Sequence, residues 1–186
     1  PTLAVIPTGA IDIRLPPGAL GRGHNVGWYV RVVFDKPFAI GIYEVTNAQW
    51  SACIKDGGCD NLDYDTTANK QYPVTQISWQ QANKYTKWLT QKTGYTYRLP
   101  SNTEWEYAAR GDLGMNRYFN LEPADVCTHG NVYDQTAEAE LVYGLDMLPC
   151  EDQKTMLATV GTYKPNQFGI FDTIGNVFEW TEDCPN

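Results

Sequence analysis

The stretch RLPSNTEWEYAARG, residues 98–111, carries the strongest folding signal in this chain. Ser101 stands at a helix N-cap position and Glu104 follows three residues later, which is the spacing of a reciprocal capping box. Behind this cap, Trp105 and two alanines lie toward one side, and a final glycine ends the run. The stretch therefore predicts a short helix that packs against a core.

Two earlier stretches carry the same capping pattern. Thr46 with Gln49 and Ser78 with Gln81 repeat the three-residue spacing, so a helix is expected after each pair. The second of these helices is expected to stop at Gly94. Ahead of them, apolar runs bounded by Pro and Gly predict strands at residues 3–6, 29–34 and 38–43, with a surface loop over residues 16–27.

The second half of the chain has weaker signals. Residues 112–162 show little periodicity and contain much Asn, Asp and Gly, which predicts a long irregular region held by a disulfide or a metal ion. Residues 168–172 then predict a turn, and residues 177–180 predict a buried aromatic strand. Five tryptophans are expected in the core: Trp50, Trp79, Trp88, Trp105 and Trp180.

Composition excludes several classes of function. The 186 residues, 42% of them hydrophobic, suffice for one folded domain, and no apolar run approaches the roughly 20 residues of a membrane-spanning helix. Twenty-two acidic residues against fourteen Lys and Arg give a net charge of −8. This balance disfavours nucleic-acid binding, which needs a cationic surface, and suits the binding of cations.

Five cysteines favour an oxidising compartment, and hence a periplasmic, secreted or cell-surface protein. Disulfides are expected between Cys53 and Cys59 and between Cys127 and Cys150. Cys184 then lacks a partner, which suggests a cysteine in a further segment or in another chain. The sequence also opens without an initiator Met, so the chain is expected to be a fragment.

Four motifs occur in a fixed order along the chain. They are EVTNAQW at residues 44–50, PV at 73–74 with ISW at 77–79, RLPSNTEWEYAARG at 98–111, and GIFDTIGNVFEW at 169–180. Together they resemble the formylglycine-generating enzyme, or sulfatase-modifying factor, family. The resemblance covers about residues 3–184. It implies an α+β, C-type-lectin-like fold with little regular secondary structure, in a single domain over residues 1–186 that lacks its C-terminal part.

The resemblance assigns no catalytic residue to this chain. The family's best-known member oxidises a sulfatase cysteine to formylglycine with molecular oxygen and a copper ion held by two cysteine thiolates, which suit Cu(I). In the family these cysteines lie in a Gly-Gly-Ser-rich stretch downstream of the segment matching residues 175–180. No cysteine here stands at that position, so copper is expected only if a further C-terminal segment supplies two cysteines. The chain as given is therefore expected to be non-enzymatic.

The resemblance does imply calcium. Members of the family bind two Ca²⁺ ions through oxygen ligands, and mixed carboxylate, amide and carbonyl ligands suit this ion. The first site would use the side chains of Asn131 and Asp152 and the carbonyls of Val132 and Lys154. The second would use the side chains of Asp172 and Glu179 and the carbonyls of Gly175 and Val177. The cationic side chain of Lys154 lowers the affinity of the first site unless it points away.

Other charged residues have structural interpretations. Arg98, Glu104 and Arg110 form a charged group, but Glu104 completes a helix cap and arginines can hold loops through hydrogen bonds to carbonyls. His24 and His129 are the only histidines, which is too few for a metal cluster or a catalytic pair.

Three functions remain open from the sequence. The first is an extracytoplasmic module that binds a protein or glycan partner and is stabilised by disulfides and Ca²⁺. The second is the N-terminal portion of an active copper-dependent formylglycine-generating oxidase, or of a related oxidase. The third is a structural subunit of a surface or secretion assembly, completed by another chain near Cys184. The presence of the scaffold motifs without the thiolate pair favours the first.

Overall fold

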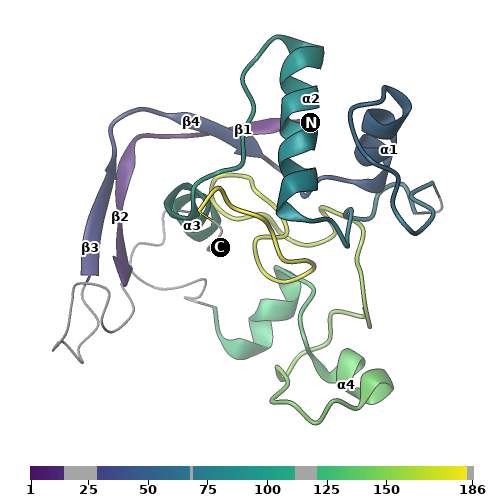
Figure 1. The fold of residues 1–186 in the computed structure, drawn as a ribbon. Helices are drawn as coiled ribbons and strands as arrows, with labels where there is room; N and C mark the ends of the chain where they lie inside the picture. Colours follow the sequence, from purple (N-terminus) through teal and green to yellow (C-terminus); the bar gives the residue numbers. More distant parts are fainter. Residues whose placement is uncertain (15–28, 68, 112–120, 184–186) are drawn as a thin grey trace, which may run out of the picture.

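The computed structural model describes residues 1–14, 29–67, 69–111 and 121–183. Its strands form two separate antiparallel pairs (Figure 1): β1 (Leu3–Ile6) with β4 (Phe38–Gly41), and β2 (Gly9–Arg14) with β3 (Tyr29–Phe34). The strands predicted at residues 3–6 and 29–34 are confirmed, and the one predicted at 38–43 ends at residue 41. The prediction missed β2, whose short run holds only two large apolar residues. The predicted loop over 16–27 lies outside the described residues.

Three capped helices follow the strands: α1 (Asn47–Lys55), α2 (Trp79–Thr93) and α3 (Asn102–Arg110). In each, the Ser or Thr at the N-cap accepts a hydrogen bond from the third helical N–H. The Gln or Glu at that third position accepts one from the N-cap N–H, so all three predicted capping boxes are confirmed. Gly94 ends α2 with a φ of 79°, a left-handed conformation that costs glycine little.

The charged residues around α3 have the structural roles expected of them. Arg98 pairs with Glu104, with Nη2 and Oε1 2.6 Å apart, and donates to the carbonyl of Leu99. Arg110 is buried and donates to the carbonyl of Asp12 at 3.2 Å, which ties the end of α3 to β2. These arginines therefore hold the chain together rather than forming a catalytic group.

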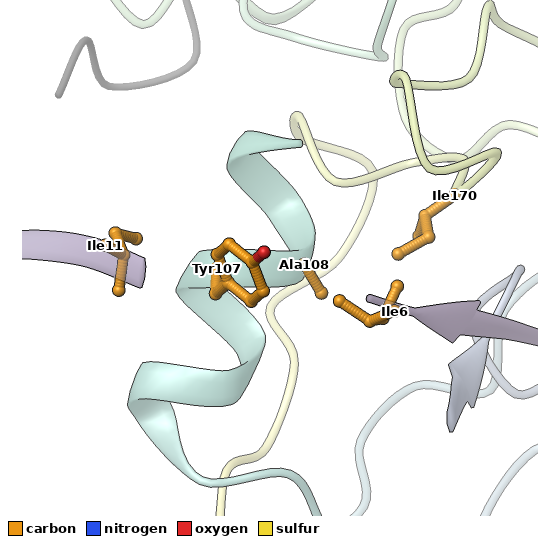
Figure 2. Close-up of a cluster of buried hydrophobic side chains, with 5 residues drawn as sticks. All are labelled: Ile6, Ile11, Tyr107, Ala108 and Ile170. Atoms are coloured by element: carbon orange, nitrogen blue, oxygen red, sulfur yellow. The ribbon is translucent and has the colours of Figure 1, made fainter. Parts of the chain in front are cut away.

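A first hydrophobic cluster packs α3 against the strands. Figure 2 shows its buried members: Ile6, Ile11, Tyr107, Ala108 and Ile170. The ring of Tyr107 stacks on Phe34, with centroids 4.7 Å apart. Because Ile170 belongs to this cluster, the C-terminal segment is held against α3 and β1 (Figure 2).

A second hydrophobic cluster lies between α1 and α2. It contains Trp50, Cys53, Val74, Tyr85 and Leu89, and Trp50 stacks on Tyr85 with ring centroids 5.6 Å apart. The expected disulfide from Cys53 to Cys59 closes the end of α1.

The long irregular region contains two short helices that the sequence reading missed. They are η1 (Pro123–Thr128) and α4 (Gln135–Leu141), the latter visible at the edge of the molecule in Figure 1. The side chain of Asp134 caps α4 by accepting the Ala137 N–H at 2.9 Å. The sequence signal for α4 is weak, because the helix has only seven residues and begins with an Asp cap rather than a capping box. The expected disulfide from Cys127 to Cys150 spans this region.

The buried aromatic strand predicted at residues 177–180 is wrong. No strand forms there, Phe178 is fully exposed and Trp180 is 38% exposed. Asp172, Gly175 and Asn176 all have positive φ, which breaks the extended run into turns. Of the five tryptophans expected in the core, only Trp50 is fully buried. Trp79, Trp88 and Trp105 are half-buried.

Candidate functional site

Two segments with the same sequence, Gly-Asn-Val at residues 130–132 and 175–177, lie against each other. A parallel bridge joins Asn131 to Gly175, and the Asn176 N–H donates to the Asn131 carbonyl at 2.8 Å. The contact is tight, because a Cβ on Gly175 would lie 1.8 Å from the Asn131 oxygen. We call this contact the turn crossing, and only glycine fits it at residue 175.

The four residues expected for the first calcium site lie together. The Asp152 carboxylate accepts the Val132 N–H at 2.8 Å and the Lys154 N–H at 2.7 Å. The Asn131 side chain is oriented by a 2.7 Å bond from its Nδ2 to the carbonyl of Met156. Burial raises the pKa of Asp152, against the lowering effect of the two N–H bonds. The Asp152 carboxylate thus holds the main chain of Val132 and Lys154, two of the other expected ligands, close together.

The second expected site contains an unsatisfied buried oxygen. Asp172 is 2% exposed, and its Oδ2 accepts the Gly161 N–H at 2.6 Å, whereas its Oδ1 is buried without a hydrogen-bond partner among the described residues. Burial raises the pKa of Asp172. Glu179 lines an open groove, yet burial of its carboxyl group raises the pKa of that group to about 7, although a hydrogen bond from Trp105 acts to lower it. A cation is the group that would satisfy these two carboxylates.

A third carboxylate, Glu44, adjoins the second site, and the sequence reading gave it no role. Its Oε2 accepts from Asn176 Nδ2 at 2.7 Å and its Oε1 accepts the Val177 N–H at 3.2 Å. Burial and then the charges of Glu179 and Asp172 raise its pKa to about 8. Its partners lie 132 and 133 positions away, so no local pattern could have revealed this role.

The described ligand set fits calcium better than a transition metal. Among the described residues, no three His, Cys, Asp or Glu side chains are arranged to hold a metal ion. A metal at either site would therefore depend on amide and carbonyl oxygens beside one or two carboxylates, which Ca²⁺ accepts. The buried, unpaired Oδ1 of Asp172 is the observation that fits such an ion.

Copper does not fit the described part of the chain. Four cysteines are joined in the two disulfides, and Cys184 lies outside the described residues. No thiolate pair is therefore present between residues 1 and 183 to bind Cu(I).

A groove of about 1460 Å³ runs between the two hydrophobic clusters. Its lining includes Trp50, Tyr85 and Leu89 from one cluster and Ile40, Ala108 and Ile170 from the other, together with Glu44, Phe178, Glu179 and Trp180. A smaller cavity of about 400 Å³ beside Tyr107 and Arg110 is lined by none of the candidate ligands. The large groove is thus the feature that adjoins the second expected metal site.

The sequence and the fold place this chain in a known family. A sequence model described as "Sulfatase-modifying factor enzyme 1-like domain" matches residues 3–186, so the chain belongs to this family. The formylglycine-generating enzyme of Streptomyces coelicolor is 35% identical over 121 residues, which are 64% of this chain and 34% of that enzyme. The mouse formylglycine-generating enzyme is 33% identical over 146 residues, which are 75% of this chain and 35% of that enzyme.

One further curated relative is described as inactive, and a solved structure has the same fold. The "inactive C-alpha-formylglycine-generating enzyme 2" of Bos taurus is 28% identical over 217 aligned residues, covering 89% of this chain and 64% of that protein. The structure of PvdO from Pseudomonas aeruginosa superposes with a TM-score of 0.75 at 28% identity, over 99% of this chain and 71% of PvdO. The expected α+β fold of the formylglycine-generating-enzyme type is therefore confirmed, and the chain spans about a third of the curated enzymes it matches.

One further finding concerns membranes. None of the helices in the described ranges has the length and apolar character needed to cross a bilayer.

Proposed function

We propose that this chain is a non-catalytic, extracytoplasmic module that binds a polypeptide partner in its groove and is stabilised by calcium. The groove between the two hydrophobic clusters is the observation that carries this proposal. Residues of both hydrophobic clusters line the groove, and Phe178, which also lines it, is fully exposed. An apolar polypeptide segment would complete such a surface, whereas a glycan would need more polar partners.

The comparisons support an occupant made of polypeptide. PvdO has the same fold over nearly all of this chain, yet 29% of PvdO lies outside the match (100% less the 71% covered). At least one relative of this fold thus contains polypeptide beyond the part that matches this chain. The two disulfides support an oxidising, extracytoplasmic location.

A selection from a random peptide library on the immobilised chain tests the groove. Enriched peptides should be rich in apolar residues and should bind the purified chain in fluorescence anisotropy. Thr173→Trp, which fills the groove lining, should weaken them at least tenfold, while Thr162→Trp, at an exposed position outside the lining, should not. Peptides that bind both variants equally, or binding of oligosaccharides only, would contradict the proposal.

The calcium part of the proposal has its own test. Ca²⁺ would be held at the first site by Asn131, Val132, Asp152 and Lys154, and at the second by Asp172, Gly175, Val177 and Glu179. A ligand that binds only the folded state raises its stability by mass action. Calcium should therefore raise the melting temperature, and Asp172→Ala with Glu179→Ala should abolish the effect at the second site. Identical melting curves of the unmodified chain with calcium and with chelator would refute it.

A second candidate function is the N-terminal portion of an active formylglycine-generating oxidase. The identity of 33–35% to curated enzymes of that name favours it. Incubation of the protein as isolated from its natural source with copper and a sulfatase-derived peptide, read by mass spectrometry, decides between the two. Formation of formylglycine would show that the protein is an enzyme and would contradict the proposal of a non-catalytic module.

A further inference from the structure

Asn176 lies between the two expected metal sites and contacts both. Its chain neighbours Gly175 and Val177 are the expected carbonyl ligands of the second site. Its side-chain Oδ1 accepts from Nδ2 of Asn131, an expected ligand of the first site, at 3.1 Å. Its N–H donates to the Asn131 carbonyl at 2.8 Å. A shift of Asn131 at the first site therefore moves the turn that supplies the second.

The side chain of Asn176 is also held from two other directions. Its Nδ2 donates to Glu44 at 2.7 Å, and its Oδ1 accepts the Ala158 N–H at 3.0 Å. The same Glu44 accepts the Val177 N–H. Asn176 keeps this arrangement at a φ of 56°, which few residues other than Gly, Asn and Asp adopt readily. The Asn176 amide thus connects its own segment to those of Glu44, Asn131 and Ala158 in one defined position.

We propose that the two calcium sites are coupled through the turn crossing, with Asn176 as the residue that transmits the coupling. The proposal rests on the calcium binding proposed above. An ion at either site orders both Gly-Asn-Val turns, because backbone and side-chain bonds join them. The second ion then binds turns that are already ordered and loses less conformational entropy, so its affinity is higher.

Calorimetric titration of the calcium-free chain measures the coupling. Glu179→Gln disables the second site and Asp152→Asn disables the first, so each variant gives the association constant of one site alone. The product of the two constants of the unmodified chain, divided by the product of these single-site constants, is the coupling factor. We expect a factor of about 5 or more, the lower end of measured couplings.

Two further variants locate the coupling. Asn176→Gly removes the amide but tolerates the positive φ, and it should bring the coupling factor close to 1. Gln76→Gly is the matched control, since it removes an exposed amide from another residue of positive φ, 55°, and should leave the factor unchanged. Each single-site constant is measured again in both backgrounds. An unchanged factor in Asn176→Gly would show that this residue does not transmit the coupling.

The outcomes separate the two proposals. A chain that binds fewer than two ions contradicts the calcium proposal itself. A chain that binds two ions with a coupling factor of 1 keeps that proposal and overturns only the coupling. If Asn176→Gly fails to fold by circular dichroism, the factor in the unmodified chain still decides whether the sites are coupled.

Discussion

The part of the chain up to Gly111 and the part from residue 121 to 183 are stabilised by different means. The first contains three capped helices and most of both hydrophobic clusters. The second contains little regular structure, and buried or half-buried polar side chains bond its main chain. These side chains are Asp134, Asp152, Asn166, Asp172 and Asn176. Local sequence therefore specifies the first part, whereas the second depends on long-range polar contacts.

The largest expected effect comes from breaking the turn crossing in the second part. Gly175→Ala would place a Cβ 1.8 Å from the Asn131 oxygen and would strain a φ of 77°. We expect a loss of about 4 kcal/mol or more in the free energy of unfolding, measured by urea denaturation. Gly169→Ala is the control, because its φ is also 77° but nothing lies within 4 Å of the added carbon. Equal losses in the two variants would show that the crossing is not tight.

The disulfides give the next comparison, one in each part. The Cys127–Cys150 bond closes a separation of 23 residues and the Cys53–Cys59 bond one of 6. Loop-closure entropy predicts that replacing the first pair by Ala costs about 3 kcal/mol and the second about 2 kcal/mol. Thermal unfolding of the two double variants measures both. A larger loss from the short ring would mean that packing around Cys53, not loop closure, dominates.

The pH dependence of stability should differ between a carboxylate that bonds the second part and one that is held within the first part. The pKa of Glu44 in the folded chain is about 8 against an ordinary 4.5, so the folded state binds more protons than the unfolded state between these values. Without calcium, stability should therefore fall as pH rises, by about 2 kcal/mol between pH 5 and 7. Urea unfolding in chelator measures it, and Glu44→Gln should flatten the slope. A slope of the opposite sign would contradict the raised pKa.

Glu104, which bonds Arg98 and Ser101 within the first part, should behave in the opposite way. The hydrogen bond from Arg98 lowers the pKa of Glu104. The stabilisation that the Glu104 carboxylate provides is therefore present above its unfolded-state pKa and is lost as pH falls through its lower folded-state pKa. This pH range lies below the one in which Glu44 changes the stability. The acid limb of the same stability profile should shrink in Glu104→Gln, and a profile unchanged at low pH would contradict the assignment.

The smallest expected effect concerns a helix cap. Ser101→Ala removes the oxygen that accepts the Glu104 N–H at 3.1 Å, and should cost about 1 kcal/mol. The loss should be the same with and without calcium, because the Ser101 hydroxyl bonds Thr103 and Glu104 in its own helix and neither residue is an expected ligand. A loss that depends on calcium would mean that the two parts are less independent than described, and equal stability would show that Ser101 is not the cap.

Much of the first part could be predicted from the sequence. The capping boxes and the stop at Gly94 are local patterns, as is the short Cys53–Cys59 ring, and all appear in the structure. The failures are instructive. β2 has too few apolar residues to stand out, and the run at residues 177–180 has a strand-like composition but follows turn residues of positive φ.

The candidate site was predicted only in part. The family resemblance named eight residues, and the structure places Val132, Asp152 and Lys154 in direct contact. The roles of Glu44 and Asn176 could not be read from the sequence, since neither has a local partner that signals them. The calcium ligand sets themselves remain a proposal.

The sequence by itself determined where α1, α2 and α3 begin, that α2 ends at Gly94, and to which family the chain belongs, because these depend on residues close together or on ordered motifs. The tertiary structure alone decided that the two Gly-Asn-Val segments lie against each other, that Asp172 keeps a buried oxygen without a partner among the described residues and that a groove separates the two clusters. Each of these arises from packing between segments far apart in the chain. Their contacts depend on three-dimensional distances that no local pattern encodes.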